Sequence, residues 1–180
     1  HEAFVYNDKS LLPKDPETGA FVSLQLLADG RQPTLKAQAV DVGGAATFYY
    51  GFNVARPPFN DPKVRLAFAK SIDREAFARD IDKISKPALS FIPPGMPGYD
   101  PGDQAQKFDP ASARKLLSES KYFGRPELQS LKITYSASAR SKVRLEWAQG
   151  QWKTNLGVDV ALDPVDSTTF SQLVKSPATV

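Results

Sequence analysis

The sequence predicts an α/β fold in which helices pack on a central sheet. Segments with apolar residues at helical spacing alternate with short segments rich in β-favouring residues, an order typical of such layered folds. Asp61-Pro62 and Asp109-Pro110 each indicate a helix start, because aspartate caps free backbone N–H groups and proline suits the first helical position. The 180 residues allow one domain, or one and a fraction, and a hydrophobic content of 41% is ordinary for a globular core.

The first clear strand is expected over residues 47–54. This segment is dense in aromatic and β-favouring residues, a composition that suits a half-buried sheet surface. Gly51 inside it suggests a bulge or a close approach by another backbone. Pro57 and Pro58 end the strand, since proline has no N–H to give to a ladder.

A helix is expected from Asp61-Pro62 to residue 81. Val64, Phe68 and Ile72 recur at intervals of four, which makes one apolar stripe that we expect to be buried against the sheet. The solvent-facing side is expected to carry the charged residues, Asp73, Arg74, Glu75 and Arg79.

The first part of the chain is less regular. Residues 1–32 are interpreted as a hairpin or as a remnant of a neighbouring lobe. Leu35–Val42 is expected to be a strand, and Gly43-Gly44 a tight turn after it. The chain starts at His1 rather than at Met and shows no signal peptide, so we expect a processed or partial chain.

A loop rich in proline and glycine follows the first helix, over residues 86–99. Its composition predicts neither a helix nor a central strand but an extended, exposed segment. The loop is either a connector over the surface or the rim of a binding cleft, because function concentrates in ordered loops. Met96 and Tyr99 are the candidate rim residues.

Five further elements are expected after the loop. They are a helix from Asp109-Pro110 with Gly124 just beyond its end, a strand over Leu131–Tyr135, a helix over Ser138–Leu156 capped by Gly157, a strand over 158–163, and a last helix through Phe170 and Leu173.

Three linked motifs resemble one known family. They are Tyr50-Gly51-Phe52-Asn53, the run 57–65, and Ser71-Ile72-Asp73-Arg74-Glu75. In this order and spacing they resemble the peptide-binding proteins of bacterial ABC importers, the solute-binding family that includes oligopeptide- and dipeptide-binding proteins. The loop 90–99 and the segment 152–160 are similar to the same family. The resemblance covers about residues 33 to 175.

The resemblance implies one lobe of a two-lobed, periplasmic-binding-protein-like fold. Residues 33–180 would form this lobe, incomplete at its C-terminal end, and the aspartate that holds the peptide's α-amino group in the family has no counterpart here. The implied function is the substrate-binding component of an ABC transporter, which captures oligopeptides or dipeptides for import. The implied partners of the full-length protein are a peptide ligand and an ABC permease. The implied location is periplasmic or extracellular, with membrane contact only through the permease or a lipid anchor absent from this chain.

Composition counts against several other functions. A net charge of +3 without a lysine- or arginine-rich block does not predict nucleic-acid binding. The absence of cysteine excludes thiol catalysis, disulfides and zinc-thiolate sites. His1 is the only histidine, so no Ser–His–carboxylate triad or histidine-based metal site is expected. We therefore expect no enzyme activity, no metal and no cofactor.

Two other functions remain open beside peptide capture. One is a non-catalytic structural or protein-interaction module. The other is a related binder of nickel chelates, haem or oligosaccharides, ligands that the resemblance also allows.

The aromatic run holds the first candidate ligand contacts. Strand alternation sends Phe48 and Tyr50 to one face and Tyr49 to the other, and at least one face must pack in the core. The resemblance implies that the early residues of this segment face the peptide. Tyr49 is the favoured contact, with Phe48 as the second.

The start of the long helix holds the other candidates, Ser138, Arg140 and Ser141. Free backbone N–H groups and the positive end of the helix dipole favour an anion there, and Arg140 adds a charge. The resemblance places the ligand's C-terminal end near this region. The alternative is that Ser138 only caps the helix and that Arg140 is solvated.

Overall fold

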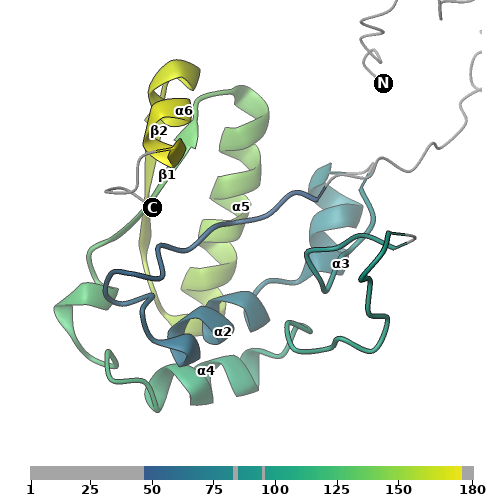
Figure 1. Ribbon diagram of the computed structural model, residues 1–180. Coiled ribbons are helices and arrows are strands. Elements are labelled where there is room, and N and C mark those ends of the chain that lie inside the picture. The colour runs from purple at the N-terminus through teal and green to yellow at the C-terminus, as the bar shows by residue number, and fades with distance from the viewer. Residues whose placement is uncertain (1–46, 83–84, 95, 176–180) are drawn as a thin grey trace, which may run out of the picture. The chain divides into compact units, whose positions relative to one another are not determined.

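The computed structural model describes residues 47–82, 85–94 and 96–175, all of which belong to one structural unit, residues 45–180. The predicted boundary near residue 33, the strand Leu35–Val42 and the turn Gly43-Gly44 lie outside the described residues. The elements are shown in Figure 1. In chain order they are α2 (Pro62–Lys70), α3 (Arg74–Ala76), a π-helical segment η3 (Phe77–Asp82), α4 (Pro110–Ser118), a 3₁₀ turn η4 (Pro126–Leu128), β1 (Leu131–Ser136), α5 (Ala139–Leu156), β2 (Val160–Val165) and α6 (Ser167–Lys175).

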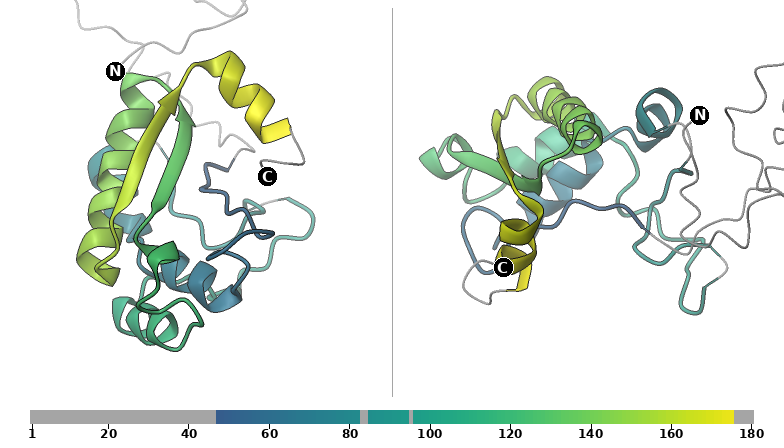
Figure 2. Two further views of the ribbon diagram at one scale, coloured as in Figure 1. Left: turned by 90° about the vertical axis from the view of Figure 1, so that its left-hand side faces the viewer. Right: turned by 90° about the horizontal axis from the view of Figure 1, so that it is seen from above.

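The sheet of the described residues has two parallel strands, β1 and β2, with Leu131 opposite Val160 and Ser136 opposite Val165. Helix α5 connects the strands and lies along one face of the sheet (Figure 2). The prediction of an α/β lobe with helices packed on a sheet is confirmed, and β2 begins two residues later than predicted. The Ala137 N–H donates to the Val165 carbonyl at 2.8 Å. By alternation along the strand, Pro164 faces the outer edge of β2, where its missing N–H breaks the row of donors.

One core joins α2, α4, α5 and the sheet. Phe68 and Ile72 are buried, as the apolar stripe predicts, but α2 packs mainly on α4, and also on α5, rather than mainly on the sheet. The buried cluster consists of Val64, Ala67, Phe68, Ile72, Leu117, Tyr122, Leu128, Leu131, Ala148, Trp152, Val158 and Val160. This core fixes α5 against α2, and so places the start of α5 relative to the segments before α2.

The ends of α5 follow the local rules of the sequence. The Ser138 Oγ accepts from the Ser141 N–H at 3.0 Å, which caps the helix start. Gly157 ends the helix in the left-handed region at φ 71°, as predicted. The prediction that Gly124 lies just beyond α4 is wrong, because α4 ends at Ser118 with Glu119 as its C-cap.

The predicted strand over residues 47–54 is not formed in the described structure, where this segment has no ladder partner. Its aromatic side chains pack on helices instead: Tyr50 lies edge-on to Trp152 at 5.6 Å, and Phe52 lies edge-on to Phe68 at 6.2 Å between ring centroids. A β-favouring composition describes side chains that suit a half-buried surface, and a helical surface satisfies it equally.

The predicted helix to residue 81 is broken after α2. The Ser71 Oγ donates to the Phe68 carbonyl at 2.8 Å, and the Asp73 carboxylate caps a new start by accepting from the Ala76 N–H at 3.0 Å. Such local hydrogen bonds compete with a continuous helix. The break turns the chain into η3, which carries Asp82 towards α5.

The Arg74 side chain stabilises this break in the helix. It was predicted to face solvent, and this prediction is wrong because the side chain is partly buried against backbone carbonyls. Its Nη1 donates to the carbonyls of Ala69 at 3.0 Å, Ile72 at 3.3 Å and Gln106 at 2.9 Å. Burial lowers the pKa of Arg74 below its ordinary value, but three carbonyls accept from its Nη1 and the side-chain oxygen of Gln106 accepts from its Nη2 at 3.0 Å.

Candidate functional site

The segment that precedes α2 presents two exposed aromatic side chains. Phe48 is 49% exposed and Tyr49 is 62% exposed. The predicted alternation of sides holds although the segment is not a strand. Phe48 lies edge-on to Tyr50 at 5.3 Å, whereas Tyr49 lies edge-on to Phe91 at 5.2 Å between ring centroids. Extended backbone is enough to separate the two sides.

The loop after η3 has no regular structure in its described residues, as predicted. It is joined to the aromatic segment by the Thr47 hydroxyl, which donates to the Phe91 carbonyl at 2.8 Å. Met96 and Tyr99 are 42% and 38% exposed, and the Tyr99 N–H donates to the Met96 carbonyl at 3.1 Å. The predicted rim residues therefore lie on one ordered turn of a loop that touches the candidate ligand contacts through Phe91.

Ser138 and Ser141 bond to each other at the start of α5. In addition to the capping bond, their hydroxyl oxygens lie 2.9 Å apart. The capping role that the sequence left open is thus confirmed for Ser138. This arrangement fixes the first turn of α5, and with it the direction of the arginines at positions 140 and 144.

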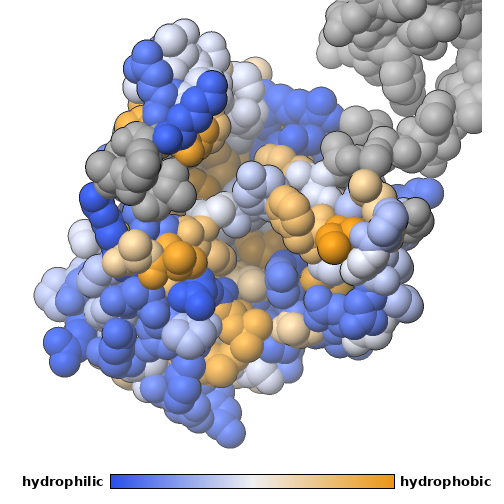
Figure 3. Space-filling view, viewed as in Figure 1, coloured by the Kyte–Doolittle hydropathy of each residue, from blue (hydrophilic) through white to orange (hydrophobic). Residues whose placement is uncertain are grey.

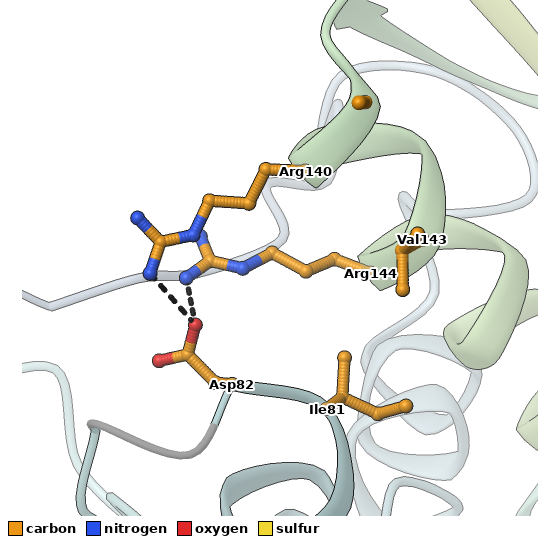
Figure 4. A pocket seen from close by; sticks show the side chains of 6 residues that line it. Ile81, Asp82, Arg140, Val143 and Arg144 are labelled. Carbon is orange, nitrogen blue, oxygen red and sulfur yellow. Dashed lines mark hydrogen bonds and ion pairs between the residues drawn. The ribbon is translucent and has the colours of Figure 1, made fainter. Parts of the chain in front are cut away.

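A buried carboxylate is the central feature of the site, and sequence reasoning missed it. The Asp82 side chain is 2% exposed. Its Oδ1 accepts from the Nη2 of Arg144 and, at 3.4 Å, from the Nη2 of Arg140, as Figure 4 shows. Its Oδ2 accepts from the Ser85 hydroxyl. The ion pairs of Asp82 with Arg140 and Arg144 join the end of η3 to the first turns of α5.

The pKa of Asp82 shows which influence dominates. Burial alone would raise this pKa, but hydrogen bonds from Ser85 and Arg144 and the charges of Arg144 and Arg140 lower it below its ordinary value. The carboxyl group therefore stays ionised at neutral pH. No periodicity or motif links residues 62 positions apart, which is why the pair could not be found from the sequence.

Arg144 connects the carboxylate to the aromatic segment. Its guanidinium carbon lies 4.6 Å from the centre of the Phe48 ring, and its carbonyl accepts from the Tyr50 hydroxyl at 3.3 Å. Burial raises the pKa of Tyr50, and the Arg144 charge offsets part of this rise. Phe48 also stacks on Phe77, with 5.9 Å between the ring centroids, so both a cation and a ring hold it in place.

A hollow of about 300 Å³ lies beside the arginines. Its lining consists of Ile81, Asp82, Ala139, Arg140, Val143 and Arg144. In Figure 4 the side chains of Ile81 and Val143 stand on one side and the charged groups on the other. On the face drawn in Figure 3, separate hydrophobic patches lie among hydrophilic surface. The arrangement offers an apolar wall next to guanidinium groups.

Two features are absent from the described residues. They contain no group of three or more histidine, cysteine, aspartate or glutamate side chains that could hold a metal ion, and no helix in the described part is long and apolar enough to cross a membrane.

Comparisons with known proteins decide the family. The model of bacterial extracellular solute-binding proteins, family 5 (middle region), matches residues 17–178. The chain belongs to this family. Its family-5 relatives include the dipeptide-binding protein DppE of Bacillus subtilis, 31% identical over 72% of the chain and 25% of the relative, and the periplasmic murein peptide-binding protein MppA of Escherichia coli, 32% identical over 69% of the chain and 24% of the relative.

The family-5 fold is also seen in solved structures. The Escherichia coli murein tripeptide-binding protein MppA superimposes with a TM-score of 0.63 at 28% identity, over 77% of this chain and 30% of that protein. The chain spans about a quarter of the length of the curated family-5 relatives that it matches.

Proposed function

We propose that the protein of which this chain forms a part captures oligopeptides or dipeptides for an ABC importer, and that this chain supplies one wall of the ligand cleft. Two relatives bear names that state dipeptide or murein-peptide binding, which supports peptides as the ligand class. A peptide ligand, an ABC permease and a periplasmic or extracellular location form one consistent proposal. Any membrane contact would be made through the permease or a lipid anchor.

The exposed guanidinium of Arg140 is the observation that carries this proposal. Its side chain is 62% exposed and touches Asp82 only at 3.4 Å, so it can turn towards a ligand at low cost. It borders the apolar hollow and begins the same helix whose free N–H groups favour anions. The C-terminal residue of a peptide carries an anionic carboxylate and a side chain. Arg140 is placed to pair with the carboxylate, and Ile81 and Val143 offer an apolar surface for the side chain.

Phe48 and Tyr49 are the proposed contacts for the body of the peptide. Tyr49 is largely exposed and Phe48 is about half exposed, and each is held by a neighbouring ring. Rigid aromatic surfaces accept many side chains, and main-chain hydrogen bonds with bridging water do not depend on sequence. Low selectivity along the peptide follows. Met96 and Tyr99 are proposed for the rim.

The proposal includes no catalysis. His1 is the only histidine of the chain, so a serine or water nucleophile has no histidine partner among the described residues. A panel of peptides and esters should be recovered unchanged. Turnover above a mock preparation that one point substitution abolishes would contradict this.

The test compares free-acid and C-terminally amidated peptides on the full-length protein. Calorimetry with matched tri- to pentapeptides should show that Arg140→Ala weakens free-acid binding by about tenfold, the size of one charge-assisted hydrogen bond, and changes amide binding little. Lys142→Ala is the matched control, since Lys142 is an exposed cation of the same helix that pairs with Glu146 at 3.8 Å. Equal losses for acid and amide in Arg140→Ala would remove Arg140 from the site.

A further inference from the structure

The two arginines beside the hollow are held very differently. The Arg144 side chain is 16% exposed, bonds to Asp82, covers the Phe48 ring and carries the Tyr50 bond on its carbonyl. The Arg140 side chain is 62% exposed and has one long contact to the same oxygen of Asp82. Because the ion pair of a buried arginine costs more to break than that of an exposed one, Arg140 is the partner that exchanges.

The charges of the lining do not cancel. Asp82, Arg140 and Arg144 are its ionised members, which leaves one positive charge, and the remaining lining residues are Ile81, Ala139 and Val143. Asp82 itself offers no free oxygen, since Oδ1 accepts from the arginines and Oδ2 from Ser85. Among the described residues that line the hollow, no further cation would balance a second anion, which would face the buried carboxylate of Asp82.

We propose that Asp82 is a specificity-determining residue, an internal counter-ion that limits the hollow to one ligand carboxylate. A ligand anion takes Arg140, while Asp82 keeps Arg144. The preferred ligands are peptides whose C-terminal residue has an uncharged side chain, which rests on the apolar wall, and peptides that end in aspartate or glutamate are disfavoured. This inference rests on the proposed function of peptide capture.

The experiment uses full-length protein and peptides of two to five residues, each made in two versions that end in asparagine or in aspartate. The two versions differ by one carboxylate at nearly constant shape. Calorimetry of the unsubstituted protein should show the asparagine version bound more tightly. In Asp82→Asn the second guanidinium becomes available, and the preference should shift towards the aspartate version by about tenfold or more, the scale of one close charge pair.

A charge-balanced double variant separates this role from simple support of the fold. Asp82→Asn combined with Arg144→Gln again leaves one positive charge, so it should restore the original preference for asparagine. An Asp82 that only holds the fold together would not give a reversal followed by a restoration. Lys142→Ala should leave the preference unchanged, because Lys142 does not line the hollow.

A second variant keeps the test open if Asp82→Asn does not fold. In Arg144→Gln, Arg140 is the one cation left to Asp82 among its described partners, so a ligand carboxylate must compete for Arg140. The advantage of free-acid over amidated peptides should fall by about tenfold although Arg140 is intact. An unchanged asparagine-to-aspartate preference in Asp82→Asn, or an unchanged acid-to-amide ratio in Arg144→Gln, overturns the role of Asp82. Absence of binding by every peptide to the unsubstituted protein overturns the proposed function as well.

Discussion

Phe68 is 2% exposed and is enclosed by aromatic rings on several sides. The centroids of Phe59 and Trp152 lie 5.3 and 5.6 Å from its own. Truncation would leave a cavity that these rigid rings cannot fill. Phe68→Ala should therefore lower the free energy of unfolding by about 3–5 kcal/mol, as measured by urea unfolding.

Val143→Ala is the control for this measurement. Val143 has the same apolar character, but it is 52% exposed on α5, so its truncation should change stability by no more than about 0.5 kcal/mol. A Phe68→Ala protein that melts within a degree of the parent would show that the core is wrongly placed.

Asp82 should make stability depend on acid pH. Its folded-state pKa lies below the ordinary value, so its ionised form contributes stability that is fully present above about pH 4 and is lost as the pH falls through the folded pKa. Asp82→Asn lacks this contribution at every pH. The difference in unfolding free energy between the two proteins should therefore be largest near pH 7 and shrink below about pH 4.

Asp80→Asn is the control for the acid series. Asp80 pairs with its neighbour Arg79, and both side chains are largely exposed, at 50% and 68%. Its substitution should give a small effect at neutral pH, because an exposed pair contributes little. A pH-independent effect of Asp82→Asn would mean that the carboxylate is not ionised in the folded protein.

Residue-scale prediction from sequence succeeded where a role depends on neighbours in the chain. Ser138 was predicted as a possible cap because the hydroxyl of a serine at a helix start can accept from a free backbone N–H. Asp82 was missed because its partners Arg140 and Arg144 lie on another helix. In the sequence, a charged residue that tertiary packing buries cannot be distinguished from a charged residue on a solvent-exposed helix face.

At the scale of elements, α5 and the segment 47–54 show two opposite outcomes. The spacing of Leu145, Ala148, Trp152 and Leu156 predicts the inner face of α5. The first three are buried, and Leu156 is partly buried against the same core. The aromatic composition of 47–54 predicts a strand that does not form in the described structure. Helical periodicity reports a geometry, whereas β-favouring composition reports only that side chains need a surface to cover.

Gly150 within α5 and its C-cap Gly157 give a matched pair of substitutions. Gly157 has φ 71° and Gly150 lies within the helix, and neither has a heavy atom within 4 Å of an added Cβ. Gly157→Ala should cost about 1 kcal/mol through backbone strain alone. Gly150→Ala should stabilise by about 0.5–1 kcal/mol, because glycine is a poor helix former.

Thermal or urea unfolding of the two variants checks this pair directly. The opposite signs exclude a common cause such as altered solubility. Stabilisation by Gly157→Ala would show that α5 does not end in the left-handed conformation.

At the scale of the whole molecule, the 180-residue chain alone should bind peptides poorly. It spans about a quarter of its relatives, and a small-ligand site buries most of the ligand's surface. If it supplies half of a binding free energy of about −8 kcal/mol, the remaining affinity is millimolar.

Calorimetry of the isolated chain against mixed di- to pentapeptides checks this expectation. No saturable heat is expected at micromolar concentrations. The full-length protein, which should saturate under the same conditions, is the control. Saturation of the isolated chain at about ten micromolar or below would show that the site is complete within it.

The family itself was accessible from sequence, because its motifs are local and linked. The runs 57–65 and 71–75 form a cis-proline turn, the capped start of helix α2 and the hydrogen bonds of Arg74 to nearby and distant carbonyls. Most of these contacts join residues that are close in the chain, so the spacing within each motif is fixed. The hollow beside Arg140 is formed by residues that only the packing of η3 on α5 brings together.

Pro164 determines on which side of the two-stranded sheet a further strand can pair. Two parallel strands are too few to stand alone and call for additional neighbours. Beside β2, an incoming strand would meet a gap in the hydrogen-bond row at the proline. Beside β1, whose segment Leu131–Ser136 contains no proline, it would meet an unbroken row. A third strand, whether from elsewhere in the same protein or from a second copy, can therefore form an unbroken row of hydrogen bonds only next to β1. In such an extended sheet β1 would be the central strand. In its absence, the free edge of β1 is the one at which self-association is expected.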